Sequence, residues 1–133
     1  MSGRWVLMAG ALLALGWFGA GCNRVDSAGE QQGGWTVLGK AVAVESLQES
    51  AGALRPALDA PEATPVQVKG TIGKVCPAGC WFYLKDGDDM VYVDVEGEYV
   101  VPPSSTGRKA LVVGTTDGDG GSRTLKATTV CLK

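Results

Sequence analysis

From position 66 to position 130 the chain repeats one pattern, in which short apolar and β-branched runs alternate with clusters of Gly, Asp, Pro and Ser. Runs of this kind predict strands, and the clusters between them predict turns. We expect five strands, at residues 66–75, 81–85, 90–95, 109–115 and 123–130. This pattern limits the chain to a mainly β domain, because helical bundles need apolar residues at a period of 3.6.

The longest break between these strands contains Pro102 and Pro103 and separates the third strand from the fourth. Five short strands interrupted in this way are typical of a small, closed, OB-like barrel. In such a barrel the fifth strand runs parallel to the third. We therefore predict a five-stranded OB-like barrel as the fold class.

One helix is expected before the barrel. Residues 45–58 carry apolar side chains at spacings of four, three and four, which predicts a single buried stripe. Ser46 is the expected N-cap, and Glu49 completes a capping box. Residues 36–44 alternate loosely and predict a further strand. The fold is thus a mainly β barrel with one short N-terminal helix.

Alternation along the second and third strands separates the core from the outer surface. One face of these strands is aliphatic or aromatic throughout and is expected in the core, namely Phe82, Leu84, Val91, Val93 and Val95. The opposite face carries Trp81, Tyr83 and Tyr92, together with Asp94. The outer face of these two strands is the usual ligand surface of OB domains, so the three aromatics form a possible ligand face. The alternative is that they pack under the helix or cover the sheet.

The start of the chain is basic and then uncharged from position 5 to position 20, which is typical of a secretory signal. Small residues precede Cys22, and the stretch resembles a bacterial lipoprotein signal in which that cysteine is acylated. We predict a signal peptide at 1–21, a flexible tether at 22–34 and an OB-like domain at 35–133. The resemblance implies attachment to a membrane through Cys22, facing the periplasm. With Asn23 after the cysteine, the same resemblance implies the outer membrane if the cell is Gram-negative.

Charge and composition exclude several classes of protein. Removal of Arg4 with the signal lowers the net charge of −2 to −3, and an acidic domain does not attract phosphate backbones. We therefore expect no nucleic-acid partner. The chain has no histidine, which excludes Ser-His and Cys-His catalysis and removes the commonest metal ligand. We expect a protein that is not an enzyme.

Three cysteines of the domain are the most specific chemical feature. Cys76 ends the first strand, Cys80 begins the second, and Cys131 follows the last. If the last strand runs parallel to the third, all three thiols converge at one end of the barrel. They then form a structural disulfide, or a soft-metal site for Cu(I) or Zn, or a thiol redox pair, or they remain inert free thiols. The sequence leaves these alternatives open.

A wider resemblance covers residues 37–130. It rests on Val75-Cys76, on Gly79-Cys80-Trp81, on Val93-Asp94-Val95 and on the run from Gly107 to Gly114. These motifs resemble an uncharacterised family of small bacterial lipoproteins with an OB-like domain of unknown function. The resemblance implies a fold and a location, and it implies no chemistry.

The sequence therefore predicts a lipid-anchored binding module of the cell envelope, with a soft metal or an envelope protein as its candidate ligand. A thiol redox enzyme or electron-transfer accessory protein is one alternative. A purely structural or interaction lipoprotein with a disulfide is the other.

Overall fold

The computed structural model describes residues 29–133. The predicted signal peptide and Cys22 lie outside the described residues. Seven strands are the main elements of this region: β1 (Glu30–Gln32), β2 (Trp35–Gly39), β3 (Pro65–Val75), β4 (Trp81–Asp86), β5 (Asp89–Asp94), β6 (Lys109–Asp117) and β7 (Thr124–Leu132). The helical elements are short: α1 (Val44–Ser50), α2 (Arg55–Asp59), and the 3-10 turns η1 (Pro103–Ser105) and η2 (Gly120–Ser122). No helix in 29–133 is long and apolar enough to cross a membrane.

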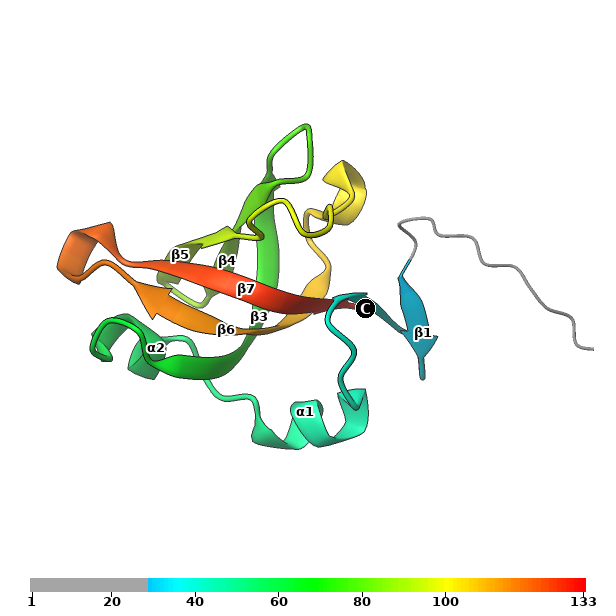
Figure 1. The fold of residues 1–133 in the computed structure, drawn as a ribbon, viewed down its shortest axis with the longest axis horizontal. Helices are drawn as coiled ribbons and strands as arrows, with labels where there is room; N and C mark the ends of the chain where they lie inside the picture. The colour runs from blue at the N-terminus through cyan, green and yellow to red at the C-terminus, as the bar shows by residue number, and fades with distance from the viewer. Residues whose placement is uncertain (1–28) are drawn as a thin grey trace, which may run out of the picture.

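Five of the strands form a closed ring in the order β3-β4-β5-β7-β6, because β6 pairs with both β7 and β3. All neighbours in the ring are antiparallel except β5 and β7, which are parallel. This is the strand order expected of the five-stranded OB-like fold, so the predicted fold class is confirmed. Figure 1 shows β7 crossing the front of the ring between β5 and β6.

The two remaining strands extend the sheet outside the ring. β2 pairs antiparallel with the last part of β7, and β1 pairs with β2 at the edge. β1 lies inside the segment predicted as tether, so that segment is structured from Glu30 onward. The predicted strand 36–44 ends early, because Gly39 takes a positive φ of 86° that breaks the extended conformation.

The single predicted helix is wrong. The chain forms α1 and α2 instead, and between them Gly52 makes an isolated bridge to Val68 of β3. Pro56 lies in the first turn of α2, where its missing N–H costs nothing, so it starts a helix rather than ending one. The predicted capping box is also absent, because α1 is capped at Ala43 without any side-chain bond from its own turn.

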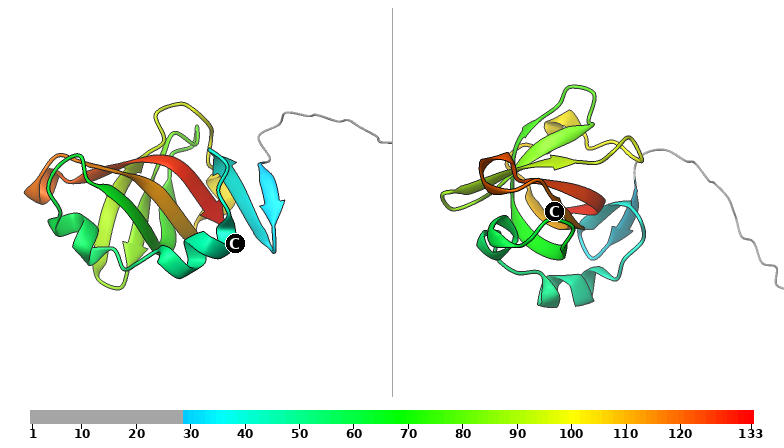
Figure 2. Two further views of the ribbon diagram at one scale, coloured as in Figure 1. Left: turned by 60° about the horizontal axis from the view of Figure 1, so that its bottom comes forward. Right: turned by 60° about the vertical axis from the view of Figure 1, so that its left-hand side comes forward.

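Two apolar cores result from this arrangement. The inner core fills the ring and contains all five residues predicted from alternation, each 3% exposed or less: Phe82, Leu84, Val91, Val93 and Val95. The outer core lies between the ring and α1: Trp35, Val37, Val44, Leu47, Ala51, Leu111 and Cys131. The two views of Figure 2 agree with Figure 1 in placing α1 and α2 on the side opposite the β3–β4 loop.

Candidate functional site

The loop between β3 and β4 brings Cys76 and Cys80 together. The Cys76 N–H donates to the Trp81 carbonyl at 2.9 Å, and the Gly79 N–H donates to the Cys76 carbonyl at 2.7 Å. Gly79 has a φ of 78° and accepts a bond from the Val101 N–H, which holds the loop against the segment before η1. The two Sγ atoms lie 3.1 Å apart as free, half-buried thiols. They are within reach of a disulfide or of a shared soft metal.

The two thiols are not equivalent. A hydrogen bond from the Cys80 thiol lowers the pKa of Cys76, and backbone N–H groups of Cys80 and Ala78 lower it further. The same sulfur contact raises the pKa of Cys80, with desolvation adding to it. Cys76 is therefore the thiol that ionises first. A thiolate is the form that attacks disulfides and binds metals.

The predicted convergence of three thiols is wrong. Cys131 is fully buried in the outer core, where desolvation raises its pKa to about 11. Strand direction was predicted correctly, but β7 continues past its pairing with β5. Lys126 pairs with Asp94, and Cys131 lies five residues further on, about 16 Å along the strand. Within residues 29–133 no group of three His, Cys, Asp or Glu side chains could hold a metal.

The predicted aromatic face is present on the outside of β4 and β5. Tyr83 pairs across the strands with Tyr92, and their rings meet edge to face at 5.8 Å. Trp81 stacks on Tyr92 at 5.5 Å and meets Tyr83 edge-on at 5.6 Å. We call these three residues the aromatic cluster. They are half-buried by one another, and α1 packs elsewhere, so the alternative of packing under a helix is wrong.

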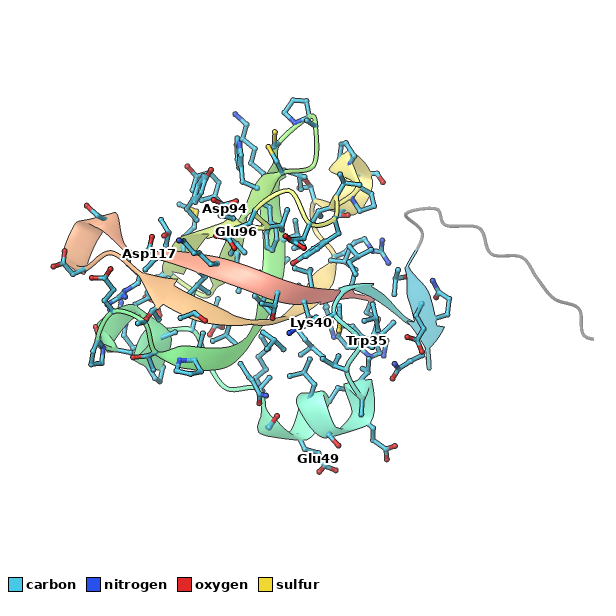
Figure 3. The ribbon with its side chains drawn as sticks, viewed as in Figure 1. Trp35, Lys40, Glu49, Asp94, Glu96 and Asp117 are labelled. Carbon is cyan, nitrogen blue, oxygen red and sulfur yellow. The ribbon has the colours of Figure 1, made fainter. Side chains whose placement is uncertain are left out.

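The cysteine pair lies close to the aromatic cluster, because the charges of both thiolates act on Tyr92. Burial raises the pKa of Tyr92, and negative charges on Asp94, Cys80 and Cys76 raise it further, as expected for neighbouring groups. Asp94 is the register partner of Trp81. In Figure 3, Asp94 lies on the β5 side of β7, while Trp35 of the outer core lies toward α1.

The acidic turn after β4 has a structural role. Asp86 accepts a hydrogen bond from the Leu54 N–H at 2.9 Å, and Asp89 forms an ion pair with Arg55. Both contacts attach α2 to the end of the ring that carries the β4–β5 turn. Asp86 and Asp89 are therefore engaged in structural contacts.

Sequence reasoning missed Arg123, which stands at the start of the last predicted strand. Arginine at such a position is ordinarily exposed, yet Arg123 is only 8% exposed. Its Nη2 group donates to the Ala60 carbonyl, while Nε and Nη1 are buried without a hydrogen-bond partner. No sequence signal distinguishes it from a surface arginine, since the Ala60 carbonyl that it bonds lies 63 residues upstream.

Comparison with known proteins identifies no family. No protein-family model matches the chain, and no curated protein sequence matches it. A solved structure, that of the hypothetical protein ygiW from E. coli, is similar with a TM-score of 0.48 and 19% sequence identity. The match covers 63% of this chain and 90% of that chain. A match at this level carries no statement about function.

Proposed function

We propose that this protein is a non-enzymatic binding module of the cell envelope, anchored by a lipid on Cys22, whose ligand surface is the outer face of β4 and β5. The observation that carries the proposal is the aromatic cluster. Three aromatic side chains gather on the face where OB-like domains bind their ligands. Aromatic side chains that stay partly exposed supply large contact area at low entropic cost.

The surface has a mixed chemical character that suits a ligand or an envelope protein rather than nucleic acid. Asp94 adjoins Trp81, and the processed chain is acidic, so a polyphosphate strand is repelled. The rings also contact one another, which holds their rotamers before any ligand arrives. Such preorganisation lowers the entropic cost of binding.

The small residues before Cys22 support the lipid anchor, and β1 begins eight residues after Cys22. An extended segment of that length spans at most about 28 Å. The anchor is tested by growing cells that express the full chain with radiolabelled palmitate. We expect label in the protein and none in the Cys22→Ser variant; equal labelling of both would overturn the anchor.

The ligand surface is tested by photo-cross-linking in living cells. A photoreactive phenylalanine analogue at position 83 is compared with the same analogue at Glu49, which is exposed on α1. We expect a discrete adduct from position 83 that disappears in a Trp81→Ala background, and none from position 49. Identical adducts from both positions would contradict the proposal.

A second candidate function, soft-metal binding, is favoured by the proximity of Cys76 and Cys80. Two thiolates suffice for a two-coordinate Cu(I) site, and thiolates select this ion. Zinc prefers four ligands, so two cysteines alone favour copper.

The copper candidate is tested by anaerobic titration with Cu(I) in the presence of a competing chelator. We expect one equivalent to bind tightly to the reduced protein, to be lost in Cys76→Ser and to be retained in Cys131→Ala, the buried control. Unchanged binding in Cys76→Ser would exclude this candidate.

A further inference from the structure

A buried positive charge without a partner lies beside the aromatic cluster. Arg123 is more than nine-tenths buried, and two of its three guanidinium nitrogens lack any acceptor. The one bond it makes, from Nη2 to the Ala60 carbonyl, leaves its charge uncompensated. Among residues 29–133 it forms no ion pair, and Asp59, which lines a cavity with it, is paired with Arg55 at 3.6 Å.

This arrangement is costly for a folded protein. Burying an ion without compensation is unfavourable by several kcal/mol, and an unmade hydrogen bond adds to that cost. An apolar residue of similar length would remove the cost altogether. A charge held in this way needs an anion to compensate it.

Two cavities meet at Arg123, with volumes of about 280 and 340 Å³. The smaller one is lined by Tyr83 and Tyr92 as well as by Arg123, so it joins the buried guanidinium to the aromatic cluster. The larger one lies over α2 and contains the paired Arg55 and Asp59. Met90 and Gly121 line both cavities.

We propose that Arg123 is an anion-binding residue that receives the carboxylate or phosphate group of a small ligand whose ring or flat body lies against Tyr83 and Tyr92. The guanidinium is the side chain best suited to planar and tetrahedral oxyanions. The β6–β7 connection, which carries η2, corresponds to a loop through which OB-like domains bind ligands.

Met90 is the movable part of this site. The unpaired nitrogens of Arg123 are shielded from water in the unliganded protein. Met90 lines both cavities with a long, unbranched side chain that is 55% exposed. In the proposed site, a rotamer change of Met90 gives the ligand access to the guanidinium.

The proposal deepens the function proposed above and rests on it for the ligand face. It is tested on the processed, lipid-anchored protein in detergent by NMR, following the Nε–H signal of Arg123 and the ring signals of Tyr83 and Tyr92. The probes are glucuronate, its neutral counterpart glucose, and inorganic phosphate. A response to glucuronate alone, to phosphate alone or to both identifies which oxyanion the site accepts.

We expect saturable shifts of the Arg123 signal with glucuronate or phosphate and none with glucose. The ring signals should shift with glucuronate. Affinity should fall at least tenfold in Arg123→Gln and stay unchanged in Arg108→Gln, a control that removes an equal charge on the far side of the ring. If Arg123→Gln does not fold, the response of the unaltered protein decides.

The outcomes separate the two proposals. If the Arg123 signal shifts and the ring signals of Tyr83 and Tyr92 do not, the anion site is supported and the aromatic face is excluded as the ligand surface. If the ring signals shift equally with glucose and glucuronate while the Arg123 signal does not shift, the aromatic face is supported as the ligand surface and the anion site is overturned. If the Nε–H signal of Arg123 responds to neither anion, the inference is overturned. A slowly exchanging water bound to Nε would then assign Arg123 a structural role.

Discussion

At the scale of single residues, the same amino acid has different chemistry on the two sides of the ring. Cys76 lies in a loop where hydrogen bonds stabilise its thiolate, whereas Cys131 is enclosed in the outer core, where desolvation opposes ionisation. Spacing in the sequence could place Cys76 near Cys80. It could not show that β7 runs on past β5, which separates Cys131 from the pair.

Thiol alkylation should therefore be selective. In the reduced native protein we expect iodoacetamide to modify Cys76 first, with a rate that rises with pH and levels off below the ordinary thiol pKa, because the thiolate is the nucleophile. Cys131 should react only after denaturation. Mass spectrometry of timed samples measures both, and rapid native labelling of Cys131 would contradict the buried placement.

The buried Cys131 thiol predicts a loss of stability in alkali. Its pKa rises from 9.0 to about 11 on folding, so between these values the native state holds a proton that the unfolded state has lost. The contribution is therefore fully present below pH 9 and is lost as pH rises toward 11. It amounts to about 2–3 kcal/mol.

Urea unfolding at pH 8, 9, 10 and 11 measures this effect. The free energy of unfolding should fall more steeply for the unaltered protein than for Cys131→Ala, and the difference isolates Cys131 from other alkaline titrations such as that of Tyr99. Parallel pH profiles for the two proteins would show that the thiol ionises freely in the native state.

At the scale of elements, the five ring strands were predictable and their surroundings were not. Alternation in β4 and β5 identified the inner core because each strand has one apolar face. By contrast, β1 is made of Glu-Gln-Gln and carries no apolar signal, so it resembled a linker. It forms because β2 offers it an edge to pair with.

The beginning of α1 depends on that unpredicted strand. Gln32 of β1 accepts a hydrogen bond from the Val44 N–H at 2.9 Å and donates one to the Val42 carbonyl at 2.8 Å. A cap supplied from twelve residues upstream cannot be recognised from the local motif. The local signal favoured Ser46 instead.

Gln32→Ala should lower the free energy of unfolding by about 1–2 kcal/mol, because the first turn of α1 loses its cap and a half-buried carbonyl loses its donor. Gln31→Ala is the matched control, since Gln31 makes only an exposed bond to Thr36. Urea denaturation compares the two. Equal losses in both variants would show that Gln32 does not cap α1.

The pairing of β6 with β7 depends on Gly114. A Cβ atom at this position would lie 2.2 Å from the Lys126 carbonyl oxygen, beside the irregularity between Val113 and Gly114. Gly114→Ala should therefore destabilise the protein by about 2–3 kcal/mol. Gly52→Ala, where no atom lies within 4 Å, should be neutral or slightly stabilising. Thermal unfolding distinguishes the two variants. An unchanged melting temperature in Gly114→Ala would mean that β7 pairs differently with β6.

At the scale of the whole molecule, the two sides of the ring differ in how far they are covered. The helices and the β1–β2 pair enclose one side and bury Cys131. On the other side, where neither helix lies (Figures 1 and 2), the cysteine pair and the aromatic cluster are only half-buried. Alternation predicted the aromatic cluster, but it could not predict Arg123, whose burial requires α2, η2 and β5 to meet.

The central claim is that the outer face of β4 and β5 is the binding surface. Hydroxyl-radical footprinting tests it most directly, by comparing the protein in intact cell envelopes with the purified protein. We predict that oxidation of Trp81, Tyr83 and Tyr92 falls at least severalfold in envelopes, while oxidation of Val42 and Leu58 on the helical side is unchanged. Equal oxidation of the aromatic cluster in both samples would contradict the claim.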